Sequence, residues 1–210
     1  MKPNLFISGA SGSGKSSSLR NLDPDKVVII NTERKQLPFR GANKFKQAQC
    51  SNYQEFLKLL ERAEKSPAEI IVIDSFTSLS EQIQAYAKAT WRGFDVWSGY
   101  ADLIYQIIQR TKMIDKYVVF IGIDEPLQDG NGEITKHVRV EGKALKGSIE
   151  KEFTCVLWAK VRNENGAIQH NFETNNDGTT TAKTPLEMFT SQYIDNDLNY
   201  VIEQIKEYYA

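Results

Sequence analysis

The feature that most constrains this chain is a glycine-rich loop close to its start. Residues 9–16 read Gly-Ala-Ser-Gly-Ser-Gly-Lys-Ser, which fits the pattern G-x-x-x-x-G-K-S. Glycines let the backbone curl until successive N–H groups point at phosphate oxygens. In this pattern the lysine reaches the β- and γ-phosphates, and the serine hydroxyl can hold Mg²⁺. The sequence therefore predicts a site for ATP and Mg²⁺, with nucleotide-binding residues Gly9, Ala10, Ser11, Gly12, Ser13, Gly14, Lys15, Ser16 and Ser17.

The segments on either side of the loop fit this interpretation. The apolar run Leu5–Ile7 precedes the loop as a short strand, and Ser16–Leu19 can open a helix. A strand before the loop and a helix after it are the context that the motif requires. The N-terminus of such a helix also attracts an anion.

Length and charge indicate the class of the protein. The chain has 210 residues and a net charge of −1. We expect a single α/β domain over residues 1–210, and any contact with DNA must come from a local basic patch. Within the domain we expect a nucleotide-binding core over 1–125, a loop and edge-strand region over 126–183, and a C-terminal helix over 184–210.

The expected location follows from cysteine spacing and hydropathy. Cys50 and Cys155 are far apart, which favours buried free thiols in a reducing compartment. No apolar run approaches the length of a membrane span, and the loop lies too near the start for a signal peptide. We expect a cytoplasmic protein with no membrane partner, in the host cytoplasm if it is phage-encoded.

The order of apolar runs predicts a mainly parallel sheet flanked by helices. Buried strands are expected at 4–8, 26–31, 69–74 and 117–123, with a weaker strand at 45–50. Helices are expected at 16–21, at 52–64 behind an Asn52/Glu55 capping box, from about 75 to 90, at 95–114, and at 197–208 behind Asp195 or Asn196. After a turn at 130–132 the pattern changes to antiparallel or edge strands at 137–140, 154–158 and 168–172, with a hairpin turn at 163–166 and a polar loop at 175–181.

Two acidic residues follow buried strands. Asp74 ends one strand, where it can hold the Mg²⁺–water shell together with Ser16, although it can also cap the next helix. Glu33 follows the preceding strand, where it can deprotonate the attacking water, although Glu33-Arg34-Lys35 also reads as a solvated charge run. Because parallel strands end at the same edge of a sheet, both can face the phosphate loop.

The phosphate loop, the strand ending in Asn31-Thr32-Glu33 and the run Ile73–Leu79 together resemble the RecA/Rad recombinase ATPase core. The resemblance implies that Glu33 is the catalytic base, acting with Lys15. It also implies that Asp74-Ser75 lies at the end of the strand whose carboxylate helps to hold Mg²⁺. A closer likeness is to short phage-encoded RecA-like ATPases of single-strand annealing or recombination. It rests also on Trp97–Tyr100 and Gly142–Leu145.

This resemblance implies DNA-binding loops after the fourth long strand, here Pro126–Ile149, with cations at Lys136, Arg139, Lys143 and Lys146. A solvated hairpin with ordinary surface lysines is the alternative. The chain departs from the family where Asp124-Glu125 replaces the usual polar sensor. Rings or filaments of this chain are expected, with a cation supplied across the interface by Lys143, Lys146 or Lys183.

Other residues support packing rather than chemistry. Trp97 and Tyr100 recur at helical spacing, which favours helix packing over base stacking. His137 and His170 have no spacing typical of a metal site.

Three functions remain open from the sequence. The first is a Mg²⁺-dependent ATPase that binds single-stranded DNA and assists phage recombination or strand annealing. The second is a nucleotide or nucleoside phosphotransferase, although the arginines after Arg62 are scattered. The third is an ATP-gated interaction module that works with a phage or host single-strand-binding or replication protein.

Overall fold

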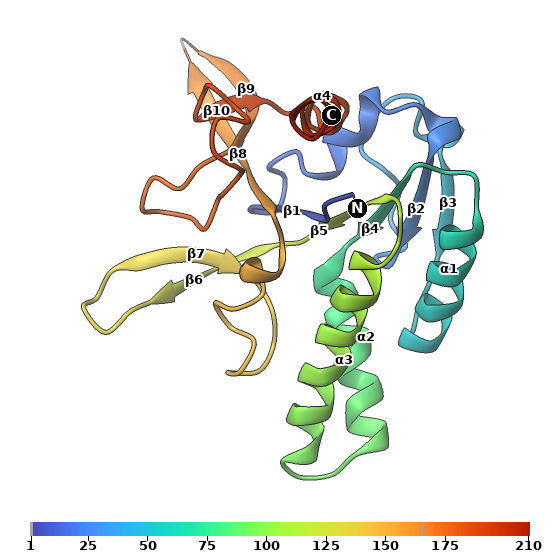
Figure 1. Cartoon of the computed structure of the whole chain (residues 1–210). Helices are drawn as coiled ribbons and strands as arrows, with labels where there is room; N and C mark the ends of the chain where they lie inside the picture. Colours follow the sequence, from blue (N-terminus) through green and yellow to red (C-terminus); the bar gives the residue numbers. More distant parts are fainter. Residues whose placement is uncertain (1, 165) are drawn as a thin grey trace.

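A central sheet organises the molecule (Figure 1). The structure is a computed structural model that describes residues 2–164 and 166–210. Its eight-stranded sheet has the order β10-β9-β8-β1-β5-β4-β2-β3, and β6 and β7 form a separate two-stranded sheet. The strands are β1 (Leu5–Ser8), β2 (Val27–Asn31), β3 (Lys46–Gln49), β4 (Ile70–Asp74), β5 (Tyr117–Ile121), β6 (Asp124–Gln128), β7 (Ile134–Val138), β8 (Cys155–Glu164), β9 (Ala167–Glu173) and β10 (Tyr193–Asp195).

Most strand pairs of the large sheet are parallel. The pairs from β3 through β2, β4, β5 and β1 to β8 are parallel, whereas the β8–β9 and β9–β10 pairs are antiparallel. The register pairs Asn31 with Asp74 and Asp74 with Ile121, so these strands end at one edge. This arrangement confirms the predicted class, an α/β P-loop fold with antiparallel strands at the C-terminal edge.

Helices cover both faces of the sheet. The α-helices are α1 (Tyr53–Lys65), α2 (Phe76–Thr90), α3 (Asp95–Lys112) and α4 (Leu198–Tyr208), and the 3₁₀ helices are η1 (Ser16–Asn21), η2 (Pro24–Lys26), η3 (Ala42–Lys44) and η4 (Glu150–Glu152). Alternate strand residues point to opposite faces, which gives two apolar cores. Helices α1, α2 and α3 pack on one core, and α4 and η1 pack on the other.

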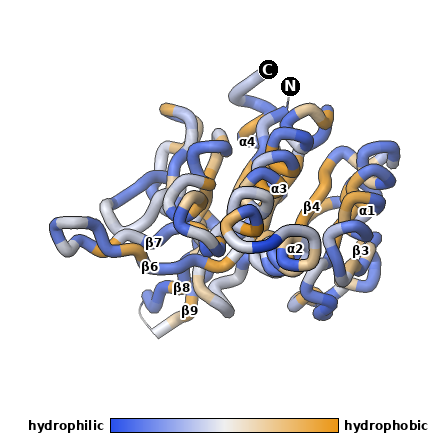
Figure 2. Tube along the Cα trace, turned by 90° about the horizontal axis from the view of Figure 1, so that it is seen from below, coloured by the Kyte–Doolittle hydropathy of each residue, from blue (hydrophilic) through white to orange (hydrophobic). Residues whose placement is uncertain are grey.

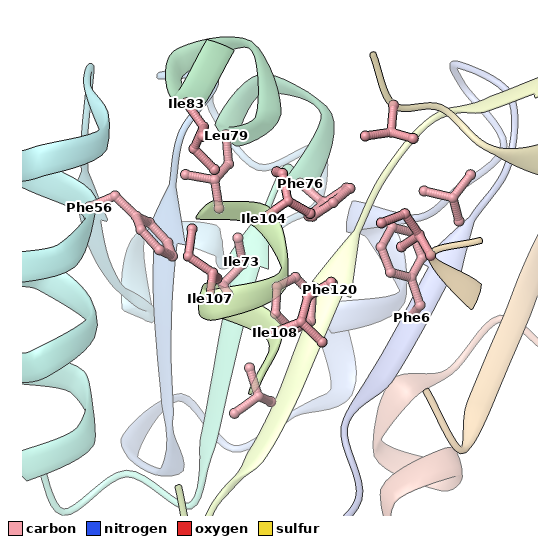
Figure 3. Close-up of a cluster of buried hydrophobic side chains, with 14 of the residues drawn as sticks. Phe6, Phe56, Ile73, Phe76, Leu79, Ile83, Ile104, Ile107, Ile108 and Phe120 are labelled. Atoms are coloured by element: carbon pink, nitrogen blue, oxygen red, sulfur yellow. The ribbon is translucent and has the colours of Figure 1, made fainter. Parts of the chain in front are cut away.

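Figure 3 shows the first of these cores. Phe56 of α1 and Ile107 of α3 meet Ile73 of β4 there, and Phe120 of β5 lies nearby. In Figure 2, β4 is drawn hydrophobic between the helices that cover it. None of the helices in the described part of the chain is long and apolar enough to cross a membrane.

Local sequence explains two of the helices. The Asn52 side chain accepts a hydrogen bond from the Glu55 N–H (2.9 Å), which confirms the expected start of α1. The apolar stripe of α3 is buried from Tyr100 to Ile108, while Trp97 remains partly exposed. The expected packing role therefore holds for Tyr100, and Trp97 lies at the rim of the core.

The structure corrects several expected elements. The helix after the phosphate loop is 3₁₀, because three consecutive serines favour local side-chain bonds over a regular α-helix. The last helix is capped by Asp197, not by Asp195 or Asn196. Strand β8 lies inside the sheet, parallel to β1, so the strand expected at 154–158 is neither an edge strand nor wholly antiparallel.

The region expected as a loop, residues 126–149, contains an antiparallel hairpin. Strand β6 pairs with β7, so the strand expected at 137–140 begins earlier and ends at Val138. The hairpin projects away from the main sheet (Figure 1). The turn expected at 163–166 includes Asn165, which lies outside the described residues, although Glu164 and Ala167 on either side of it pair as predicted.

Candidate nucleotide site

A cavity of about 400 Å³ lies at the carboxyl edge of the sheet, over the phosphate loop. The elements that line it are the phosphate loop, the chain ends after β2, β4 and β5, and β9. The cavity brings together most of the predicted site: Ser11, Gly12, Gly14, Lys15, Ser16, Ser17, Glu33 and Asp74. The other predicted residues of the loop, Gly9, Ala10 and Ser13, do not line the cavity.

The loop lies close against strand β8. Gly9 has a φ of +147°, and a Cβ atom there would lie 2.5 Å from the Ala159 carbonyl oxygen. Only glycine fits this close approach of two backbones without displacement. The backbone of β8 therefore fixes the path by which the chain enters the phosphate loop.

The Lys15 side chain folds back onto the start of the phosphate loop. Its Nζ donates to the carbonyl oxygens of Gly9 and Ala10, both at 2.7 Å. Burial lowers the pKa of Lys15, and the negative charges of Asp124, Asp74 and Glu33 oppose that shift. The amine thus lies among carboxylates, in a place where a phosphate can also reach it.

Asp74 is the most buried carboxylate of the site, with 9% of its surface exposed. Burial raises the pKa of Asp74 to about 6, and a hydrogen bond from the Ser16 side chain opposes the rise. A hydroxyl and a carboxylate in contact are the oxygen ligands that Mg²⁺ prefers. The donor set at this edge therefore fits Mg²⁺ held between Ser16, Asp74 and nucleotide phosphates.

Binding of Mg²⁺ by Ser16 and Asp74 does not require a larger group of acidic side chains. Among residues 2–164 and 166–210, no group of three or more His, Cys, Asp or Glu side chains is placed to hold a metal ion alone. Mg²⁺ commonly takes few protein ligands and several from water and phosphate.

Glu33 faces the same cavity from the end of β2. Its Oε1 accepts a hydrogen bond from the Ser75 hydroxyl (2.7 Å), and its Oε2 lies 2.9 Å from Lys35 Nζ. Burial would raise the pKa of Glu33, but the bonds from Lys35 and Ser75 outweigh it and lower the pKa. Glu33 is therefore ionised at neutral pH; it is half-buried against Ser75, and its partner Lys35 belongs to the same charge run.

Thr32 ties the two acidic strand ends together, a role that the sequence did not indicate. Its hydroxyl donates to the Ser75 carbonyl oxygen (2.7 Å) and accepts from the Ser75 N–H (2.8 Å). Its own carbonyl oxygen accepts from Ser78 and Gln82. This network fixes the spacing between Glu33 and Asp74.

His170 of β9 is a second residue that sequence reasoning missed. Its Nδ1 donates to the Ser13 carbonyl oxygen (3.1 Å), and a Cβ at Gly14 would lie 2.8 Å from the same nitrogen. The histidine also lines the cavity. The hairpin of β8 and β9 brings it to the loop because β8 pairs with β1, and no local pattern predicts that distant pairing.

The predicted DNA-binding cations fall into two groups. Lys136 Nζ lies 3.2 Å from Asp124, and Lys146 Nζ lies 2.8 Å from Glu125. Arg139 and Lys143 are exposed and make no ion pair with any described residue. The Asp124-Glu125 pair, which replaces the expected sensor, thus holds two of the four cations.

The candidates for a cation supplied to a neighbouring subunit also differ in exposure. Lys183 is half-buried, its backbone bridges Val156, and burial lowers its pKa. Lys143 and Lys146 are exposed.

One of two comparisons with known proteins identifies a family. A search of curated proteins finds no match to this chain. A family model described as "AAA domain" matches residues 1–186, which include the whole phosphate loop, Glu33 and Asp74. The chain therefore belongs to the AAA domain family, a family of P-loop ATPase-like proteins.

Proposed function

We propose that this protein is a Mg²⁺-dependent ATPase of the RecA-like kind, which binds single-stranded DNA and assists recombination or strand annealing. The observation that carries the proposal is the meeting of Lys15, Asp74 and Glu33 around one cavity over a phosphate loop. Membership of the AAA domain family supports nucleotide use. The phosphotransferase alternative is less favoured, since none of the residues lining the cavity is an arginine.

Each residue has a distinct task in hydrolysis. The loop N–H groups and Lys15 bind the β- and γ-phosphates. Ser16 and Asp74 hold Mg²⁺, which when bound neutralises phosphate charge. Glu33 accepts a proton from water as the water oxygen bonds to the γ-phosphorus and the bond to the β–γ bridging oxygen breaks.

The DNA half of the proposal is supported by Arg139 and Lys143. Both are exposed cations on the segment that begins beside the nucleotide cavity, and cations at such positions can bind backbone phosphates. Lys136 and Lys146 contribute only if their bonds to Asp124 and Glu125 are released. We further propose that subunits assemble as a ring or filament, with Lys143 or Lys146 near a neighbour's phosphates and a phage or host single-strand-binding or replication protein as partner.

The experiment is ATP turnover with and without single-stranded DNA, combined with light scattering in each nucleotide state. We expect Mg²⁺-dependent turnover that DNA changes and that Lys15→Ala abolishes, with Lys58→Ala on α1 as the control. Absent turnover with tight ATP retention would favour the interaction module instead. Phosphate transfer to nucleosides or nucleotides would favour the phosphotransferase.

The DNA contacts have their own test. Arg139→Glu and Lys143→Glu should weaken binding of a labelled oligonucleotide at low salt and reduce its salt dependence. Lys58→Glu, which makes the same change of charge on α1, should leave binding unchanged. Equal affinity in all the variants would exclude these residues from the DNA site.

A further inference from the structure

A second cavity lies away from the phosphate loop, between helix α3 and the segment Gly142–Lys146. Its volume is about 450 Å³, within the roughly 300–1,000 Å³ of typical small-ligand sites. Its lining is mostly apolar: Trp97, Tyr100, Ala101, Gly142, Lys143, Ala144, Leu145 and Lys146. Residues after β7 lie beside α3 in Figure 1. We call this space the aromatic cavity.

The aromatic cavity is shaped around the Trp97 ring. Trp97 is 45% exposed, and its ring meets that of Tyr100 edge to face at 6.5 Å between centroids. Gly142 has a φ of +80°, a backbone conformation that favours glycine, and a Cβ there would be in ordinary van der Waals contact with the Trp97 ring at 3.4 Å. The segment therefore lies against the indole, while one part of the ring stays exposed.

The segment that closes the aromatic cavity is held firmly. Leu145 is buried in the α3 core, and Ser148 shares a hydrogen bond with Tyr105 of α3 (3.2 Å). Backbone bonds from the Leu145 and Lys146 N–H groups to the Gly142 carbonyl oxygen form a tight turn. The cavity is thus a formed site and does not depend on a ligand to order it.

Two lysines line the aromatic cavity. Lys143 is exposed and makes no ion pair with a residue that the structure describes, and Lys146 pairs with Glu125 at 2.8 Å. Glu141, next to Gly142, is not part of the lining. A flat apolar floor beside cations fits a planar ring attached to a phosphate, because bases stack on aromatic side chains while lysines neutralise the backbone.

We propose that the aromatic cavity binds one nucleobase of single-stranded DNA, with Trp97 as the stacking surface and Lys143 near the adjoining phosphate. This inference rests on the proposed DNA-binding function and deepens it. It also gives a short connection to ATP: Ile123 lines the nucleotide cavity, and Glu125, two residues later, holds Lys146 of the aromatic cavity.

The test separates base stacking from charge. An oligothymidylate and an abasic oligonucleotide of equal length carry the same phosphates, and fluorescence anisotropy measures the affinity for each. Trp97→Ala should weaken binding of the oligothymidylate by about tenfold and leave the abasic oligonucleotide unchanged. Lys143→Gln should weaken both.

Two further variants keep the test independent of folding. Phe94→Ala removes a neighbouring aromatic that is 94% exposed and does not line the cavity, so its affinities should match those of the unmodified protein. Ala144→Phe fills the cavity from its exposed side, so it should reproduce the loss seen with Trp97→Ala while the unfolding midpoint stays unchanged.

The outcomes distinguish the two proposals. Oligothymidylate binding that is equal in the unmodified protein, Trp97→Ala and Ala144→Phe would overturn the base site but leave DNA binding standing. No DNA binding by the unmodified protein, with ATP turnover intact, would overturn the DNA half and the base site with it. Self-association lost in Trp97→Ala, with unchanged oligothymidylate affinity, would show that the cavity receives protein and overturn the inference.

Discussion

At the scale of single residues, two carboxylates at one sheet edge have opposite environments. Burial raises the pKa of Asp74 to about 6, whereas bonds from Lys35 and Ser75 outweigh burial and lower the pKa of Glu33. A carboxylate with a depressed pKa is ionised at neutral pH, and the bonds that lower its pKa also make it a weaker base. One with a raised pKa gains from a bound cation that stabilises its charge. Glu33 therefore carries the charge that a base needs but must lose the bond from Lys35 or Ser75 to accept a proton readily, whereas Asp74 gains most from Mg²⁺.

The raised pKa of Asp74 predicts a pH-dependent stability difference. Its protonated form stabilises the fold, and that contribution is fully present below about pH 4 and is lost as pH rises through about 6. Asp74→Asn should therefore raise the free energy of unfolding above pH 6 by about 1–3 kcal/mol, and with it the unfolding temperature, and show little difference near pH 4. Thermal unfolding of both proteins across pH measures this, and a constant difference would contradict it.

Gly9 gives a second prediction at this scale. Gly9→Ala places a methyl group against the Ala159 carbonyl oxygen in a backbone region that favours glycine, and such strain costs about 1–3 kcal/mol. We expect lower stability and weaker ATP binding, measured by thermal unfolding and calorimetry. Gly93→Ala also has positive φ but meets nothing within 4 Å, so it should lose less stability and no ATP affinity. Equal effects in the two variants would contradict this account.

At the scale of elements, the ends of β2 and β4 act as one unit because Thr32 bonds to both backbone groups of Ser75. Thr32→Val keeps the shape and removes the hydroxyl. It should displace Glu33 and lower kcat by about tenfold or more, with little change in KM. Thr90→Val, which removes an exposed hydroxyl at the end of α2, is the control. An unchanged kcat in Thr32→Val would show that the network does not position Glu33.

Elements with continuous apolar runs could be predicted from the sequence, and elements built by distant pairing could not. Strands β1, β2, β4 and β5 are covered on both faces, so their residues are apolar except for the polar last residue of β1, β2 and β4. Strand β6 reads Asp-Glu-Pro-Leu-Gln and β10 has only three residues, so each depends on its partner strand for definition. Side chains at the ends of predictable strands, such as Glu33 and Asp74, could be placed at one edge for the same reason. The strand that carries His170 is predicted from the sequence, but the pairing of β8 with β1, which brings the hairpin of β8 and β9 to the phosphate loop, has no local signal.

At the scale of the whole molecule, the nucleotide cavity and the aromatic cavity are separate, and the chain that leaves β5 runs from one to the other. The nucleotide cavity lies over the carboxyl edge, and the aromatic cavity lies on α3 beyond the hairpin that leaves β5. Asp124 and Glu125 stand between these regions, bonded to Lys136 and Lys146. These ion pairs are the shortest connection between the nucleotide cavity and the segment proposed to bind DNA.

Glu33 is the proposed base in hydrolysis, and the variant Glu33→Gln measures that role. The variant keeps the size of the side chain and loses its basicity, so it should bind ATP with unchanged affinity and hydrolyse it at least about a hundredfold more slowly. Glu61→Gln is the matched control, since Glu61 also pairs with a lysine but lies on α1. Calorimetry for binding and phosphate release for turnover give the two readouts. Hydrolysis by Glu33→Gln at the rate of the unmodified protein would contradict the central claim.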